Sequence, residues 1–207
     1  MPIMDNYRYY WRVEPNIRIF CDIEEDLFKV MAKNQYKYGF TMSMYEFLAT
    51  IPTLWSATLD FVKANPKHVH ENNLLEFISD DNGKSYNLCH FWSNFEIADL
   101  DFWRSPAYRE YFEYLDKQGG FFYERWGDAP VHSIAAALFL NRTEVAYFGQ
   151  VGYSHPPYTN CPTERGFHSS HNCICNPGNS FTFDGYSCAS KYFKVQGIDG
   201  KSYDSYL

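Results

Sequence analysis

Segments with the periodicity of strands alternate with segments with the periodicity of helices along most of this chain. Apolar residues alternate over residues 13–21 and 38–44, as in strands, and recur at helical spacing over 24–34 between them. Strands that alternate with helices build layered α/β folds, so we expect an α/β class with a mixed sheet flanked by helices. Four further helices are expected, at residues 50–66, 71–79, 105–120 and 128–140.

Two of these helices carry clear start and stop signals. Ser105 precedes Pro106, and Gly119 follows the last helical residue, which is typical of an N-cap, a first-turn proline and a C-terminal glycine. Asp128 is expected to cap the next helix, with Pro130 in its first turn. The extended chain at residues 86–97 is expected to lead into an acidic stretch.

Size and charge limit the class of protein. The chain has 207 residues, of which 45% are hydrophobic, so we expect one domain with a packed core over residues 1–207. The net charge of -7 argues against nucleic acid or an anionic membrane as partner. Aromatic residues make up 20%; most should be core, although flat rings also suit sugar faces. The sequence shows no signal peptide and no membrane span.

Six cysteines point to an oxidising compartment. Four of them fall between Cys161 and Cys188, inside an irregular, polar segment at 156–190 that is too poor in aliphatic residues to be held by burial. Disulfides are therefore favoured. The sequon at Asn141 agrees with a secretory location. A zinc site is the alternative, with ligands at His168, His171, Cys173 and Cys175.

The aromatic stretch from Phe91 to Trp103 contains three acids. A carboxylate among rings is costly unless it is paired or hydrogen-bonded, and Glu96 has the least obvious structural reason to be there. Asp99 and Asp101 are interpreted as solvent-facing residues before the next helix. If residues 93–100 were helical, Glu96 and Asp99 would approach the carboxyl spacing of roughly 5–5.5 Å found in retaining glycosidases.

Other candidates for chemistry lie near strand ends. Arg12 and Glu14 share one face of a strand, where Glu14 is either a hard-metal ligand or half of a structural ion pair. His155 follows a strand in a loop bounded by glycine and proline, a common place for a metal ligand. His132 lies among apolar helix residues and is interpreted as a core histidine.

Long blocks of the sequence resemble one known family. "WRVEP", "TIPTLW", "CHFWSNFEIADLDFWRS", "GGFFYERWGDAPVHSIA" and "GYSHPPYTNCP" are similar to the fungal Golgi α-1,2-mannosyltransferases of glycosyltransferase family 15, from about Tyr9 to Cys188. The resemblance implies a GT-A-like fold. The catalytic domains of the family extend upstream of this region. The resemblance therefore also implies that this chain is the C-terminal portion of such a domain, without the first nucleotide-binding strands. We expect a Golgi lumen location, with the membrane reached only through an anchor absent from this chain.

The resemblance also implies a reaction. It is the retaining transfer of mannose from a GDP-mannose donor to a mannose hydroxyl of a glycoprotein glycan, with Mn²⁺ as cofactor. The "DLD" triplet is then not the metal motif. Motif by motif, the family's residues correspond to the metal ligands Glu14 and His155, the catalytic residues Glu96 and Asp128, and the substrate-binding residues Arg12 and Trp92.

The sequence is also compatible with two other functions. One is a non-catalytic mannose-binding module that uses the aromatic groove. The other is a retaining glycoside hydrolase that uses Glu96 and a second carboxylate.

Overall fold

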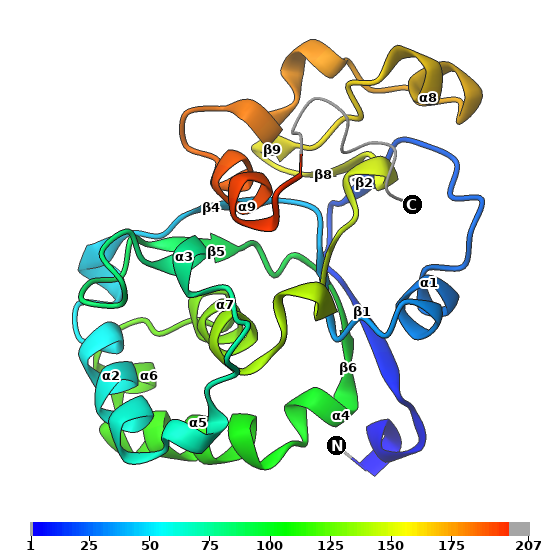
Figure 1. The fold of residues 1–207 in the computed structure, drawn as a ribbon. Helices are drawn as coiled ribbons and strands as arrows, with labels where there is room; N and C mark the ends of the chain where they lie inside the picture. Colours follow the sequence, from blue (N-terminus) through cyan, green and yellow to red (C-terminus); the bar gives the residue numbers. More distant parts are fainter. Residues whose placement is uncertain (1, 199–207) are drawn as a thin grey trace.

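The computed structural model describes residues 2–198 (Figure 1). Its largest sheet is a four-stranded mixed sheet. Strand β6 is antiparallel to both of its neighbours, β1 and β3, whereas β3 and β7 are parallel. This arrangement confirms the α/β class with a mixed sheet. The strand order is β1 (Tyr9–Val13), β6 (Phe95–Asp99), β3 (Tyr38–Phe40), β7 (Val145–Tyr147).

Two small antiparallel sheets accompany the central one. In the first, β4 (Ser43–Tyr45) pairs with β5 (Cys89–Phe91). In the second, β8 (Tyr153–His155) pairs with β2 (Arg18–Ile19) and β9 (Tyr158–Thr159). These sheets hold the chain segments that approach the end of β1.

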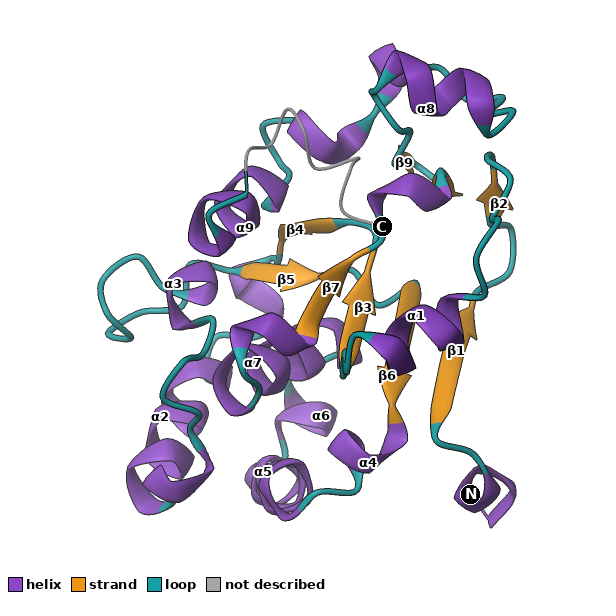
Figure 2. Cartoon of the chain, turned by 45° about the vertical axis from the view of Figure 1, so that its right-hand side comes forward, coloured by secondary structure: helices purple, strands orange, loops and turns teal. Residues whose placement is uncertain are grey.

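Helices lie on both faces of the central sheet (Figure 2). Helix α7 packs on one face together with α2, α3 and α5, and α1 packs on the other. The α-helices are α1 (Leu27–Lys33), α2 (Leu54–Ala64), α3 (Leu75–Ile78), α4 (Leu100–Trp103), α5 (Pro106–Gln118), α6 (Gly120–Tyr123), α7 (Asp128–Phe139), α8 (Arg165–Ser170) and α9 (Ala189–Gln196). The 3₁₀ turns are η1 (Pro2–Asn6), η2 (Leu48–Thr50), η3 (Pro66–His68), η4 (Arg142–Glu144), η5 (Gly149–Val151), η6 (Pro177–Asn179) and η7 (Phe181–Phe183).

Strand β6 separates two hydrophobic clusters. Phe95 and Ile97 belong to the cluster on the α1 side, whereas Ala98 belongs to the cluster on the α7 side. Side chains alternate between the faces of a strand, so Glu96 points to the same face as Ala98. The alternation of side chains along β6 therefore places the Glu96 carboxylate on the face that α7 covers.

Several expected elements are shorter than predicted. The strand expected at 13–21 is interrupted after Val13, where Pro15 is followed by Asn16 with a φ of 62°. The expected strand at 38–44 divides into β3 and β4, and α1 begins only after Asp26, whose side chain accepts from the Phe28 amide at 2.9 Å. Turn residues and caps override the apolar pattern at these points.

The second half of the chain gives one confirmation and two corrections. Ser105 caps α5 and Gly119 ends it with a φ of 79°, as predicted. The helical alternative for residues 93–100 is wrong, because this segment is mostly the buried strand β6. Asp128 is the first residue of α7 rather than its cap, and the cap residue is Gly127.

All six cysteines form disulfides, and the zinc alternative is wrong for this structure. His168 Nε2 lies 2.8 Å from the Cys175 carbonyl oxygen, and His171 pairs with Glu24 at 3.7 Å instead of with a thiolate. Within 156–190 the chain forms the short elements β9 and α8, so this segment is less irregular than expected. The disulfides are Cys21–Cys173, Cys89–Cys188 and Cys161–Cys175.

Across residues 2–198, none of the helices combines the length and the apolarity that crossing a membrane requires.

Gly39 provides a test of the central packing. A Cβ atom at Gly39 would lie 2.3 Å from a ring carbon of Phe148, so Gly39→Ala should force this buried ring aside. We expect the free energy of unfolding in urea to fall by about 1–3 kcal/mol. The matched control is Gly185→Ala, where a Cβ would meet no atom within 4 Å and stability should change little. Equal unfolding curves for the two variants would contradict this packing.

Candidate active site

Three chain segments meet at the turn formed by residues 92–94, between β5 and β6. Arg12, near the end of β1, donates from Nη1 to Ser93 Oγ at 3.3 Å. Tyr153 on β8 donates from its hydroxyl to a carbonyl of the turn at 2.9 Å. The Trp92 and His155 rings lie perpendicular with centroids 5.2 Å apart. Residues distant in the sequence therefore share one site.

Arg12 is the centre of this site. Its Nε donates to Glu14 Oε1 at 2.7 Å, and its Nη1 forms an ion pair with Asp128 at the start of α7. The three side chains are partly exposed, with relative exposures of 34%, 27% and 45%. One guanidinium thus fixes two carboxylates from different elements while leaving them accessible.

Glu14 and His155 have the character of metal ligands. Glu14 Oε1 accepts the bonds from Arg12, and Oε2 has no hydrogen-bond partner among residues 2–198. His155 Nδ1 lies 3.0 Å from the Pro156 carbonyl oxygen; donation there leaves Nε2 as an available lone pair. One carboxylate oxygen and one imidazole nitrogen are donors that suit Mn²⁺.

The charge of Glu14 influences Tyr153 on β8. Burial raises the pKa of Tyr153, and the negative charge of Glu14 raises it further. His155 lies two residues beyond Tyr153 on the same strand.

Glu96 lies behind this site in a polar cage. Its side chain is 1% exposed and accepts hydrogen bonds from the hydroxyls of Tyr10 and Tyr38, the latter at 2.9 Å. His132 Nδ1 lies 2.9 Å from Glu96 Oε2. Burial alone would raise the pKa of Glu96, but the His132 charge and the three hydrogen bonds outweigh it and lower the pKa. The carboxylate is therefore held ionised.

The cage follows from strand register and helix spacing. Tyr10 and Tyr38 flank β6 on its two sides, both paired with Ala98, so they share the face of Glu96. His132 lies one turn after Asp128 on α7. The core-histidine interpretation of His132 is wrong, because its ring is 21% exposed and pairs with an acid. Its spacing of four residues from Asp128 was the available signal.

Asp99 also differs from expectation. It is fully buried, binds Lys37 at 2.9 Å and Arg8 at 3.3 Å, and accepts from the Asp101 amide at 2.9 Å. Of the three acids between Phe91 and Trp103, only Asp101 is exposed. Because residues three apart in a strand point to opposite faces, Glu96 and Asp99 do not form the carboxylate pair of a retaining glycosidase.

A cleft of about 500 Å³ opens beside this cluster. Trp92 and Asp128 line it, together with Tyr158, whose ring centroid is 5.7 Å from that of Trp92. Glu96 is not among the residues, within the described part of the chain, that line the cleft. The arrangement offers an accessible acid and aromatic rings at the surface, with a second acid buried behind them.

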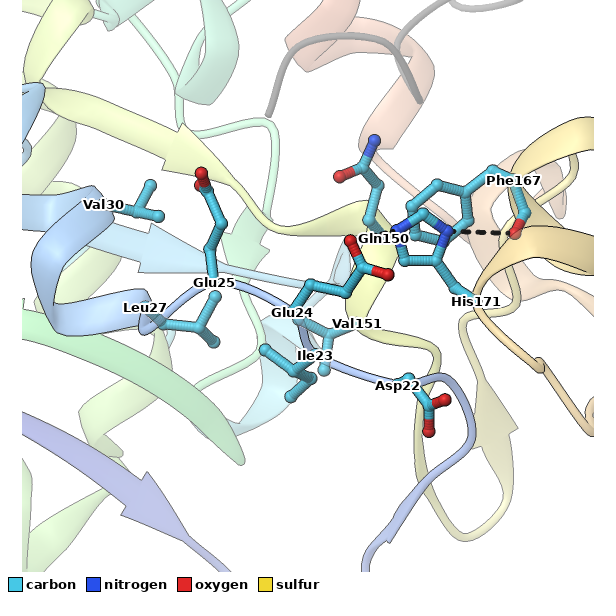
Figure 3. Close-up of a pocket in the computed structure, with 10 residues that line it drawn as sticks. All are labelled: Asp22, Ile23, Glu24, Glu25, Leu27, Val30, Gln150, Val151, Phe167 and His171. Carbon is cyan, nitrogen blue, oxygen red and sulfur yellow. Dashed lines mark hydrogen bonds and ion pairs between the residues drawn. The ribbon is translucent and has the colours of Figure 1, made fainter.

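A smaller cavity of about 210 Å³ lies between the start of α1 and α8 (Figure 3). Asp22, Glu24 and Glu25 line it, and His171 faces Glu24 across it at 3.7 Å. Among the described residues it shares no lining residue with the cleft beside Trp92. It therefore stands apart from the cluster around Arg12.

Comparison with known proteins identifies close relatives. The family model described as glycolipid 2-alpha-mannosyltransferase matches residues 1–197. The glycolipid 2-alpha-mannosyltransferase of Saccharomyces cerevisiae is 61% identical over 196 residues, covering 95% of this chain and 44% of that protein. Alpha-1,2 mannosyltransferase KTR1 of the same yeast is 58% identical over 197 residues, covering 95% and 50%. The chain thus spans about half the length, or less, of these curated relatives.

Solved structures agree with the fold. Core-mannan synthase A (CmsA/Ktr4) from Aspergillus fumigatus, in its Mn/GDP form, matches with a TM-score of 0.86 and 43% identity, over 96% of this chain and 55% of that one. The mannosyltransferase Ktr4p from S. cerevisiae in complex with GDP matches with a TM-score of 0.89 and 39% identity, over 100% and 55%. The resemblance found in the sequence is confirmed: the chain belongs to the glycolipid 2-alpha-mannosyltransferase family.

Proposed function

We propose that this chain carries the metal-binding and acceptor-binding part of a retaining α-1,2-mannosyltransferase. The enzyme transfers mannose from GDP-mannose to mannose hydroxyls of glycoprotein glycans in the Golgi lumen. The main support is a connected set of contacts: Arg12 binds Glu14, Asp128 and Ser93, and Trp92, the residue before Ser93, packs against His155. The relatives of this chain are named mannosyltransferases. The three disulfides suit an oxidising lumen.

Glu14 and His155 are the proposed metal ligands. When bound, Mn²⁺ neutralises the diphosphate charge of the departing GDP. Arg12 holds the Glu14 carboxylate in one orientation, so the ligand is positioned before the ion arrives. This arrangement suits a protein of net charge -7, which needs a cation to bind a diphosphate.

Trp92 and Asp128 are the proposed acceptor-binding groups. The Trp92 ring lines the cleft, where it presents an apolar face to the C–H groups of a sugar. Asp128, 45% exposed and fixed by Arg12, accepts a hydrogen bond from an acceptor hydroxyl and orients it for transfer.

Glu96 is the proposed catalytic carboxylate; with a side chain only 1% exposed, it acts through its charge from behind the cleft, below the lower face of the transferred mannose. Retention of stereochemistry calls for such a partner or for same-face return of the acceptor. Three hydrogen bonds occupy most of the acceptor capacity of Glu96. This supports electrostatic stabilisation of an oxocarbenium-like centre more than direct attack.

Calorimetry tests the whole proposal. Binding of GDP-mannose that requires Mn²⁺ would support the transferase. A non-catalytic mannose-binding module would instead bind oligomannose with no dependence on Mn²⁺, and that result would overturn the proposal.

His155→Ala should remove one metal ligand. We expect Mn²⁺ affinity, measured by electron paramagnetic resonance of the free ion, to fall by about tenfold or more, because one coordinate bond is lost. The matched control is His171→Ala, which removes an imidazole that pairs with Glu24 at 3.7 Å and does not line the cleft beside Trp92. Equal Mn²⁺ titrations of His155→Ala and the unmodified protein would remove His155 from the metal site.

Glu96→Gln should remove the buried negative charge while keeping the side-chain volume. We expect the transfer rate to fall by about 10²-fold or more, with Mn²⁺-dependent nucleotide binding within twofold of normal. Glu110→Gln is the control, since Glu110 also binds a histidine, His68, at 2.7 Å but is an exposed residue of α5 rather than a buried acid. Normal turnover in Glu96→Gln would exclude Glu96 from the reaction.

A further inference from the structure

We propose that Asn141 carries an N-linked glycan, so that this chain is itself a glycoprotein. Its side chain accepts an oligosaccharide that begins with N-acetylglucosamine and is delivered from a lipid diphosphate by the oligosaccharyltransferase of the secretory pathway. Asn141, Arg142 and Thr143 form the one Asn-x-Ser/Thr triplet in the 207 residues. The inference does not rest on the proposed mannosyl transfer, because attachment requires only an acceptor amide and a secretory location.

The Asn141 carboxamide is oriented by its oxygen. Asn141 Oδ1 accepts hydrogen bonds from the Thr143 amide at 3.1 Å and from the Thr143 hydroxyl at 3.0 Å. Asn72 Nδ2 donates to the same oxygen at 3.0 Å. A backbone amide only donates, so the atom that faces Thr143 must be the oxygen. The Asn141 nitrogen therefore points away from these three donors.

The nitrogen that accepts the glycan is unpaired and accessible. Asn141 Nδ2 makes no hydrogen bond with any residue between 2 and 198, and it is not one of the buried side-chain atoms in that range that lack a partner. It therefore faces solvent. Asn72 and Thr143, which hold the oxygen, are themselves exposed. The folded surface thus leaves room for a bulky, hydrophilic group at this atom.

Two other segments of the chain hold the turn that follows Asn141. The Arg142 amide donates to the Asn72 carbonyl at 2.8 Å, which ties η4 to the loop before α3. Arg142 Nη1 donates to the Val195 carbonyl at 3.0 Å, and Gln196 Nε2 donates to the Arg142 carbonyl at 2.8 Å. The glycan is therefore attached at a fixed place between the loop before α3 and the end of α9.

The glycan lies away from the proposed acceptor cleft. Asp128, the first residue of α7, lines that cleft, whereas Asn141 follows the last residue of the same helix by two positions. A helix rises about 1.5 Å per residue, so roughly 18 Å lie between the two ends of α7. Glu76 and Val195, both contacted by the middle residue of the sequon, instead line an open groove of about 760 Å³ between α3 and α9. The glycan therefore borders that groove and leaves the cleft open.

The attachment reaction is balanced with a lipid-linked oligosaccharide as the donor. Asn141 Nδ2 forms a bond to C1 of the N-acetylglucosamine, the bond between C1 and the lipid diphosphate breaks, and the diphosphate leaves with the electron pair. One proton leaves Nδ2. The three disulfides agree with the oxidising lumen in which this transferase works.

The test is a glycan map of the secreted protein. The full chain is produced in cultured mammalian cells behind a cleavable secretion leader, and the monomeric fraction in which all six cysteines are paired is isolated. Peptide-N-glycosidase F removes N-glycans and converts the acceptor asparagine into aspartate. We expect one glycan per chain, complete loss of it on digestion, and aspartate at position 141 in the mass spectrum of the released peptide.

Three variants and one control assign the glycan to the sequon. Asn141→Asp should remove it, because an oxygen remains to accept from Thr143 and Asn72 while the acceptor nitrogen is gone. Thr143→Ala should also remove the glycan, and Thr143→Ser, which keeps the hydroxyl, should retain it. The matched control is Asn82→Asp, which changes an exposed asparagine outside any sequon and should leave the glycan in place.

Three results would overturn the inference. The first is a monomeric, fully disulfide-bonded chain with no glycan at position 141. The second is a glycan found only in the aggregated fraction, which would mean that the fold does not accommodate it. The third is unchanged glycosylation in Asn141→Asp.

Discussion

The Arg12 guanidinium is the interaction on which the rest of the site depends. It connects the end of β1 to Ser93 in the turn before β6 and to Asp128 at the start of α7, and it binds Glu14 just after β1. Without this cation, two partly exposed acids would repel each other at the edge of a protein that is already acidic. The Arg12 side chain thus fixes both Glu14, the proposed metal ligand, and Asp128, which is proposed to bind the acceptor sugar.

The second acid of the site is stabilised in a different way. Glu96 lies under the sheet surface, where water does not reach it, and two tyrosine hydroxyls and the His132 ring replace the lost hydration. Burial together with the charge of Glu96 raises the pKa of Tyr10 and Tyr38, so both hydroxyls remain donors. A buried charge held in this way is already organised before any sugar approaches.

The fold class was predictable because alternation of strands and helices is a property of long segments. Helix α5 was predictable to its ends, since Ser105 and Gly119 act through local backbone geometry. The bounds of the short strands could not be predicted. Strand β3 pairs with β6 whereas β4 pairs with β5, and no local residue pattern marks this change of partner. The motif residues around the turn were found through resemblance to a family. The partners of Glu96 were missed, because strand pairing brings Tyr10 and Tyr38 together from distant positions and no local pattern records it.

The disulfide between Cys89 and Cys188 gives the cleft an order of assembly. It closes a loop of 99 residues and joins the strand before Trp92 to the segment that carries Tyr186, which also lines the cleft. The segment that carries Tyr186 is therefore tied covalently to β5 only after Cys188 has been synthesised and oxidised. Without this disulfide the Tyr186 segment would lose its covalent tie to β5, whereas the central sheet and the Arg12 cluster contain no cysteine. The full cleft would then form only in an oxidising compartment.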